Sequence, residues 1–121
     1  MSYESRIIIV NRNVIERRDG TLWVYGDQIA SIDMSCMCQG FVELFKNEID
    51  YELYIDDGNE STNKDCYGKV MTYTDCKTVI KYLKKLIANG HNYRRLTMLL
   101  GLLKGINEDQ WEDIQVVHYG Y

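Results

Sequence analysis

The sequence predicts an α+β domain in which two hairpins and a C-terminal strand form an antiparallel sheet, with two antiparallel helices packed on one face. Three patterns indicate this fold. Apolar and polar residues alternate over 6–34 and 49–73, apolar residues recur at helical spacing over 74–90, and alternation returns over 114–119. With 121 residues, of which 45% are hydrophobic and 26% charged, the chain is expected to form a single domain over residues 1–121.

The first hairpin is expected over residues 6–34, because Asp19-Gly20 between two apolar runs is a signal for a two-residue turn. Such a turn sets this register: Arg18 faces Thr21, Ile15 faces Val24, Val10 faces Ile29 and Ile7 faces Ile32. The face beneath the helices then carries Ile7, Ile9, Ile15, Leu22, Val24, Ala30, Ile32 and Met34. Polar interruptions at 11–13 and 26–28 face each other and predict a bulge or a strong twist near Gly26.

The opposite face of this hairpin carries Trp23 and Tyr25 beside Ile8, Val10 and several charged side chains. Aromatic rings on such a mixed face are either covered by another part of the chain or offered to a partner. Both alternatives stay open from the sequence. Trp23 and Tyr25 are candidate anchors for a protein interface, where amphipathic rings are common.

A second hairpin is expected over residues 49–73, after a segment over 40–47 whose apolar spacing fits a short helical turn or a strand. The loop of this hairpin includes Asp56, Asp57 and Glu60 and is the most acidic and polar stretch of the chain. Its acidic residues lack the ligand spacing of a calcium loop. We therefore expect a solvated acidic loop without a bound ion.

The longest helix is expected over residues 74–90, with one apolar stripe formed by Cys76, Val79, Ile80, Leu83, Leu86 and Ile87. Thr74 is its expected cap, and Asn89-Gly90 is its expected end. This stripe needs a sheet or another helix to cover it.

A second helix is expected from the cap Asn92 to about Lys104, with Gly105 at its end. Arg94 and Arg95 fall in its first turn, where the helix dipole disfavours positive charge. An anion-binding site, a pairing with the acidic loop and an ordinary surface salt bridge each explain this conflict.

The four cysteines do not have the spacing of a zinc site, because one pair is C-x-C and another member lies on the helix stripe: Cys36, Cys38, Cys66 and Cys76. We expect reduced thiols, no metal and no cofactor. The chain also lacks the G-x-S-x-G, P-loop and H-E-x-x-H motifs, so we expect no enzymatic activity. The alternative is a small hydrolase or nucleotide-handling enzyme with a pocket near Arg94, Arg95 and His118. A Cys76–His118 pair is the candidate catalytic pair, although a thiol and a histidine in one small core are more often packing than chemistry.

The net charge of −4 works against direct binding to nucleic acid or to an anionic membrane, and it favours a protein partner with a basic surface. The candidate partner-binding residues are Trp23, Tyr25, Asp56, Asp57, Glu60, Arg94 and Arg95. A homodimer stays open. The longest apolar run, residues 7–10, is too short to span a bilayer, and the N-terminus lacks a secretion signal, so we expect a soluble cytoplasmic protein.

Three segments resemble small uncharacterised proteins of Firmicutes phages and mobile elements: residues 49–59, the run Asn92-Tyr-Arg-Arg and the closing residues 116–121. The resemblance covers mainly residues 49–121, and no functional residue is carried over from it. It implies an accessory protein made during infection or transfer. Acidic single-domain proteins of that origin often block host defence complexes such as CRISPR effectors, so the resemblance implies an anti-CRISPR-like inhibitor, with a phage structural or assembly component as the alternative.

Overall fold

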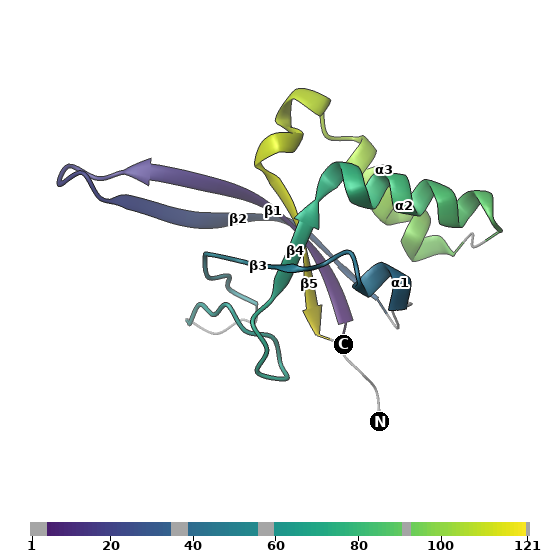
Figure 1. The fold of residues 1–121 in the computed structure, drawn as a ribbon, viewed down its shortest axis with the longest axis horizontal. Coiled ribbons are helices and arrows are strands. Elements are labelled where there is room, and N and C mark those ends of the chain that lie inside the picture. The colour runs from purple at the N-terminus through teal and green to yellow at the C-terminus, as the bar shows by residue number, and fades with distance from the viewer. Residues whose placement is uncertain (1–4, 35–38, 56–59, 91–92, 121) are drawn as a thin grey trace.

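The computed structural model describes residues 5–34, 39–55, 60–90 and 93–120. A five-stranded antiparallel sheet in the order β2-β1-β5-β4-β3 carries helices on one face, which confirms the predicted α+β fold (Figure 1). The strands are β1 (Ser5–Glu16), β2 (Leu22–Asp33), β3 (Asn47–Glu48), β4 (Thr72–Asp75) and β5 (Ile114–Gly120). The helices are α1 (Gln39–Val42), α2 (Cys76–Ala88), α3 (Arg94–Lys104) and the 3-10 helix η1 (Glu108–Asp113).

The helical layer packs on the face of the sheet that carries Ile7, Ile9 and Val116. In Figure 1, α2 and α3 lie side by side, and the two helices contact each other. Their fully buried side chains include Cys76, Val79, Leu83, Leu99 and Leu103, so the first part of the predicted helix stripe forms the core. Leu86 and Ile87, at the end of that stripe, are only partly buried. Phe41 and Phe45, from the predicted helical turn, join the same cluster.

The start of α2 lies two residues later than the predicted start at Thr74. Thr74 lies in β4, and Asp75, whose backbone is extended, precedes the helix, so the predicted Thr74 cap is wrong. The end at Asn89-Gly90 is confirmed, since Gly90 has a φ of +91°. The helix α3 ends at Gly105 as expected, whereas its predicted cap Asn92 lies outside the described residues.

A second layer covers the other face of the sheet, where Ile8, Val10 and Val117 are buried. It consists of four apolar side chains from the segment that precedes β4: Ile49, Tyr51, Leu53 and Met71. The second hairpin is therefore smaller than predicted, with strand pairing limited to β3 with β4 and to the isolated bridges Leu53–Thr62 and Lys64–Val70. The alternation of apolar residues over 49–53 reflects burial of one side of this segment. That side packs on the face of the sheet, and the segment does not add a strand to its edge.

The first hairpin forms with the predicted pair Ile7–Ile32, but its outer half is shifted by one residue. The turn holds three residues between Arg17 and Thr21, since the Arg17 amide donates to the Thr21 carbonyl at 2.7 Å. Ile15 therefore faces Trp23 and Val10 faces Gln28, where Val24 and Ile29 had been predicted. A bulge opposite Ile9 and Val10 absorbs the shift, so the bulge predicted at Gly26 lies closer to the body.

This shift moves every outer side chain of β2 to the other face of the hairpin. Trp23 and Tyr25 pair with Ile15 and Asn13, which continue the face beneath the helices, whereas Leu22 and Val24 lie on the face of Val10. The predicted faces of these four β2 residues are therefore wrong. The two-residue turn assumed in the prediction is the cause.

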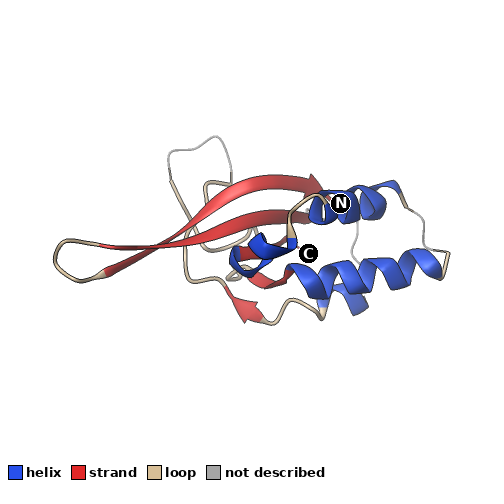
Figure 2. Cartoon of the chain, turned by 90° about the horizontal axis from the view of Figure 1, so that it is seen from above, coloured by secondary structure: helices blue, strands red, loops and turns tan. Residues whose placement is uncertain are grey.

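The outer half of the hairpin projects from the molecule as a two-stranded arm, residues 12–26. The last pairing of β1 with β5 joins Asn11 and Ile114, so beyond this level β1 pairs with β2 alone. Figures 1 and 2 show the arm extending away from the helices and the rest of the sheet. The helix layer ends before it, so side chains on both faces of the arm are exposed at its outer end.

Candidate protein-binding surface

The tip of the arm is held in one conformation by hydrogen bonds within the turn. The Asp19 carboxylate accepts bonds from the Thr21 hydroxyl at 2.6 Å and from the Thr21 amide at 3.0 Å. The side-chain bond from Thr21, followed by the backbone bond, lowers the pKa of Asp19. Gly20, with a φ of +85°, supplies the left-handed residue that a three-residue hairpin loop requires. The tip is therefore an ordered turn.

One face of the arm, the aromatic face, is formed by Ile15, Arg17, Trp23 and Tyr25. The rings of Trp23 and Tyr25 stack with centroids 4.9 Å apart and an interplanar angle of 30°. The guanidinium carbon of Arg17 lies 5.6 Å from the centroid of Trp23, at a distance where a cation is attracted to the ring. Trp23 remains 47% exposed, so its contacts within the arm leave about half of the side chain for a partner.

The other face of the arm, the aliphatic face, carries Val14, Leu22 and Val24. Leu22 is 68% exposed and Val14 46% exposed, whereas Val24 packs against the covering layer. Ile15 and Leu22 had been predicted to lie beneath the helices. Their exposure follows from the length of the hairpin relative to the helix layer, which alternation within the strands does not reveal.

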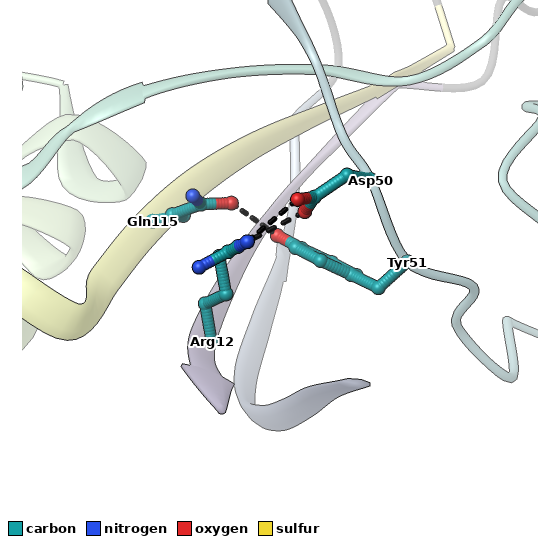
Figure 3. A network of polar contacts seen from close by, with 4 residues as sticks. All are labelled: Arg12, Asp50, Tyr51 and Gln115. Carbon is teal, nitrogen blue, oxygen red and sulfur yellow. Dashed lines mark hydrogen bonds and ion pairs between the residues drawn. The ribbon is translucent and has the colours of Figure 1, made fainter. Parts of the chain in front are cut away.

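A polar network at the root of the arm joins three segments that are distant in sequence (Figure 3). Arg12 donates two bonds to the Asp50 carboxylate, from Nε at 3.0 Å and from Nη2 at 2.6 Å. Beside this pair, the Tyr51 hydroxyl donates to Oε1 of Gln115 at 2.6 Å. The network connects β1, the covering layer and β5, and so fixes the covering layer where the arm leaves the body.

The electrostatics of this network follow from its bonds. The hydrogen bond from Arg12 lowers the pKa of Asp50 and raises the pKa of the Arg12 guanidinium. Burial, followed by the charge of Asp50, raises the pKa of Tyr51. The phenol therefore stays protonated and can donate to Gln115 across the physiological range.

We expect Asp50→Asn to lower the free energy of unfolding at pH 7 by about 0.5 kcal/mol, because the Arg12–Asp50 pair is partly exposed. The Asp50 pKa is lowered in the folded state from its ordinary value of 3.8. Its contribution is therefore present above pH 3.8 and lost as the pH falls through the folded value. Denaturant unfolding at pH 7 and near pH 2.5 checks this.

A matched variant, Arg12→Gln, should show the same loss at pH 7, and the double variant should add little. A difference between wild type and Asp50→Asn that stays constant down to about pH 2.5 would contradict an ionic contribution from this pair.

Of the other predicted partner-binding residues, the structure describes Glu60, Arg94 and Arg95, and none of these belongs to the arm. Asp56 and Asp57 lie outside the described residues, and Glu60 is exposed. Arg94 and Arg95 are exposed at the start of α3. Among the described candidates, the exposed apolar surface is that of the arm, where Trp23 is 47% exposed.

The residues of the alternative catalytic pocket do not share an exposed surface. His118 is buried on β5 beside Phe45, with ring centroids 5.5 Å apart, whereas Arg94 and Arg95 are exposed. Burial, followed by the charge of Asp75, raises the pKa of the Cys76 thiol to about 11. Cys76 is therefore a protonated thiol at neutral pH and a poor nucleophile.

The metal prediction concerns four cysteines, of which Cys36 and Cys38 lie outside the described residues. Cys66 is exposed and Cys76 is buried, and both are free thiols. Across residues 5–34, 39–55, 60–90 and 93–120, no group of three or more His, Cys, Asp or Glu side chains is placed to hold a metal ion. The absence of a bound metal stays a prediction for the whole chain.

Comparisons of the chain with protein-family models, with curated proteins and with solved structures found no match. The candidate surface therefore rests on the geometry of the arm. In the described part of the chain, no helix has both the length and the apolar character needed to cross a membrane.

Proposed function

We propose that this protein is a protein-binding module and that the projecting arm is its binding element. The observation that carries the proposal is Trp23, which is held by Tyr25 and Arg17 and is still 47% exposed, on an arm that extends beyond the body. Ordered, half-exposed aromatic side chains lose little conformational entropy on binding and are the residues most enriched among interface hot spots. The exposed aliphatic residues Val14 and Leu22 add apolar surface on the opposite face of the arm.

The proposed partner is a protein with a basic surface in the cytosol of the host cell. The net charge of −4 supports this choice over a nucleic acid or a membrane. The arm, residues 12–26, carries Arg12, Arg17 and Arg18 against Glu16 and Asp19, so its own charge is slightly positive and the acidic excess lies on the rest of the chain. In this arrangement the body steers the approach and the arm anchors the complex.

Inhibition of a host defence complex, as by anti-CRISPR proteins, is the specific form of binding that we propose. The resemblance of residues 49–121 to proteins of phages and mobile elements supports it. The test is affinity capture from a bacterial lysate with the wild-type protein and a Trp23→Ala variant, followed by mass spectrometry. We expect one host complex to be retained by the wild type and lost with Trp23→Ala. Equal retention by both variants, or retention of no protein, would contradict a binding role for the arm.

Trp23→Ala should speed dissociation from an identified partner about tenfold or more, with little change in the association rate, because a buried ring must be withdrawn before the complex separates. Surface plasmon resonance measures both rates. The matched control is Tyr54→Ala, which removes an exposed aromatic ring outside the arm and should leave both rates unchanged. An unchanged dissociation rate for Trp23→Ala in a folded protein would place the interface elsewhere.

A further inference from the structure

The outer edge of β2 has the properties of an unused pairing surface. In the sheet order, β2 is at one end, so no strand in the described chain pairs with its outer side. Edge strands are ordinarily protected by proline, charge, bulges or short length. The segment Leu22–Gly26 contains neither proline nor a charged residue, and the bulge lies nearer the body, beyond Gln28.

The backbone direction along this segment follows from the turn. The Arg17 amide bonds the Thr21 carbonyl, and bonded pairs alternate with non-bonded pairs along an antiparallel ladder. Trp23 and Tyr25 therefore direct their amide and carbonyl groups toward β1. Those of Leu22, Val24 and Gly26 point outward from the edge. Three consecutive outward positions are thus available to a further strand.

We propose that the occupant of this edge is a second copy of the chain, with two arms pairing antiparallel through β2 about a two-fold axis at Val24. This register places Val24 opposite the partner copy's Val24 and Leu22 opposite the partner copy's Gly26, which are the outward-directed residues. The two-fold axis repeats the second pair as Gly26 opposite the partner copy's Leu22. Each of these three pairs exchanges two hydrogen bonds, so six form between the two arms. A two-fold interface requires such self-complementarity.

The side chains of the aromatic face fit the same register. Trp23 lies opposite the partner copy's Tyr25 at a non-bonded pair, where cross-strand side chains approach most closely. The four rings form one ladder across the two arms. This arrangement extends the aromatic stack of Trp23 and Tyr25 that each arm already contains.

Charge complementarity selects this occupant. Arg17 and Asp27 lie on the aromatic face at opposite ends of the apolar segment, and within the described chain neither forms an ion pair. The Arg17 guanidinium already leans across β2 over Trp23. In the proposed register, Asp27 of the partner copy lies opposite Thr21, within reach of this guanidinium. Each dimer contains the Arg17–Asp27 contact twice.

The proposed dimer is independent of the proposed binding function, because it uses the edge of the arm and leaves the aromatic face open. A monomeric protein could still bind a partner through Trp23, and a dimer could form without any partner. The oligomeric state of the purified full-length chain therefore tests the dimer alone.

The first test compares two proline variants at the same level of the arm by sedimentation-velocity centrifugation. Val24→Pro removes an amide that points toward the proposed partner copy, whereas Val14→Pro removes one that points from the opposite edge. We expect a wild-type dimer, a dissociation constant raised about tenfold or more by Val24→Pro, and a smaller change with Val14→Pro. A wild-type protein that stays monomeric up to about 1 mM overturns the proposal.

The second test uses surface charges and does not depend on the fold of the proline variants. Arg17→Glu and Asp27→Lys should each raise the dimer dissociation constant about threefold or more, because each creates two like-charge contacts per dimer. The combined variant should return to within about twofold of the wild type. If the two proline variants have equal effects, the combined charge variant decides. A dissociation constant restored to near the wild-type value supports the register, and one no lower than that of the single charge variants overturns it.

Discussion

Replacing Leu83 by alanine is expected to lower the free energy of unfolding by about 3 kcal/mol. Leu83 is fully buried on α2, in the cluster that joins the helices to Ile7, Ile9 and Val116 of the sheet. The substitution removes the transfer free energy of three carbon atoms and leaves a cavity among side chains from several elements, which relax only in part. Urea unfolding followed by circular dichroism measures the change in midpoint at constant slope.

Leu102→Ala is the matched control, since Leu102 is 42% exposed on α3 and its truncation leaves no enclosed cavity. We expect its effect to stay below about 1 kcal/mol. Equal effects at the two leucines, or a loss below about 0.5 kcal/mol at Leu83, would show that the helix stripe is not the core of the protein.

Gly26→Ala should lower the free energy of unfolding by about 2 kcal/mol, because one methyl group has no room at the root of the arm. A Cβ atom on Gly26 would lie 2.6 Å from Cδ2 and Cε2 of the Tyr51 ring and 2.8 Å from Cγ1 of Val10. The ring cannot move freely, since its hydroxyl is bonded to Gln115. Denaturant unfolding measures the loss.

Two further variants separate this overlap from a general intolerance of alanine. Gly101→Ala, on the exposed side of α3, where the new Cβ would meet nothing within 4 Å beyond its chain neighbours and the backbone of its own helix, should stabilise the protein by about 0.5 to 1 kcal/mol. In a Tyr51→Leu background, Gly26→Ala should cost less than in the wild type, because the ring atoms nearest the methyl group are gone. If Gly26→Ala lowers the free energy of unfolding equally in that background, the loss arises from the backbone of β2 and not from the Tyr51 ring.

The fold class could be predicted because the helix and strand periods identify each element, although the central strands β1 and β5 are buried on both faces. The apolar stripe of α2 and the alternation in β1 and β5 need only the helix and strand periods for their interpretation. The covering layer was harder to predict. Ile49, Tyr51 and Leu53 alternate like a strand of the sheet, and only tertiary packing decides that they cross it.

The candidate surface depended on a register that the sequence did not settle. Trp23 and Tyr25 were identified by composition, but their face was wrong, because Asp19-Gly20 fits a three-residue loop as well as a two-residue one. Below the bulge, the error cancels and the pair Ile7–Ile32 is as predicted. The exposure of Leu22 and Val14 was missed because it depends on where the helices end.

The position of β5 within the sheet has a consequence for the order of folding. Late in the sequence, β5 lies between β1 and β4, and it is the strand that joins the β1–β2 hairpin to the β3–β4 pair. A nascent chain can form the first hairpin as soon as its two strands are synthesised, but the sheet stays in two parts until β5 is made. Such non-local pairing slows folding and leaves strand edges open to other nascent chains, so this protein should fold largely after β5 leaves the ribosome.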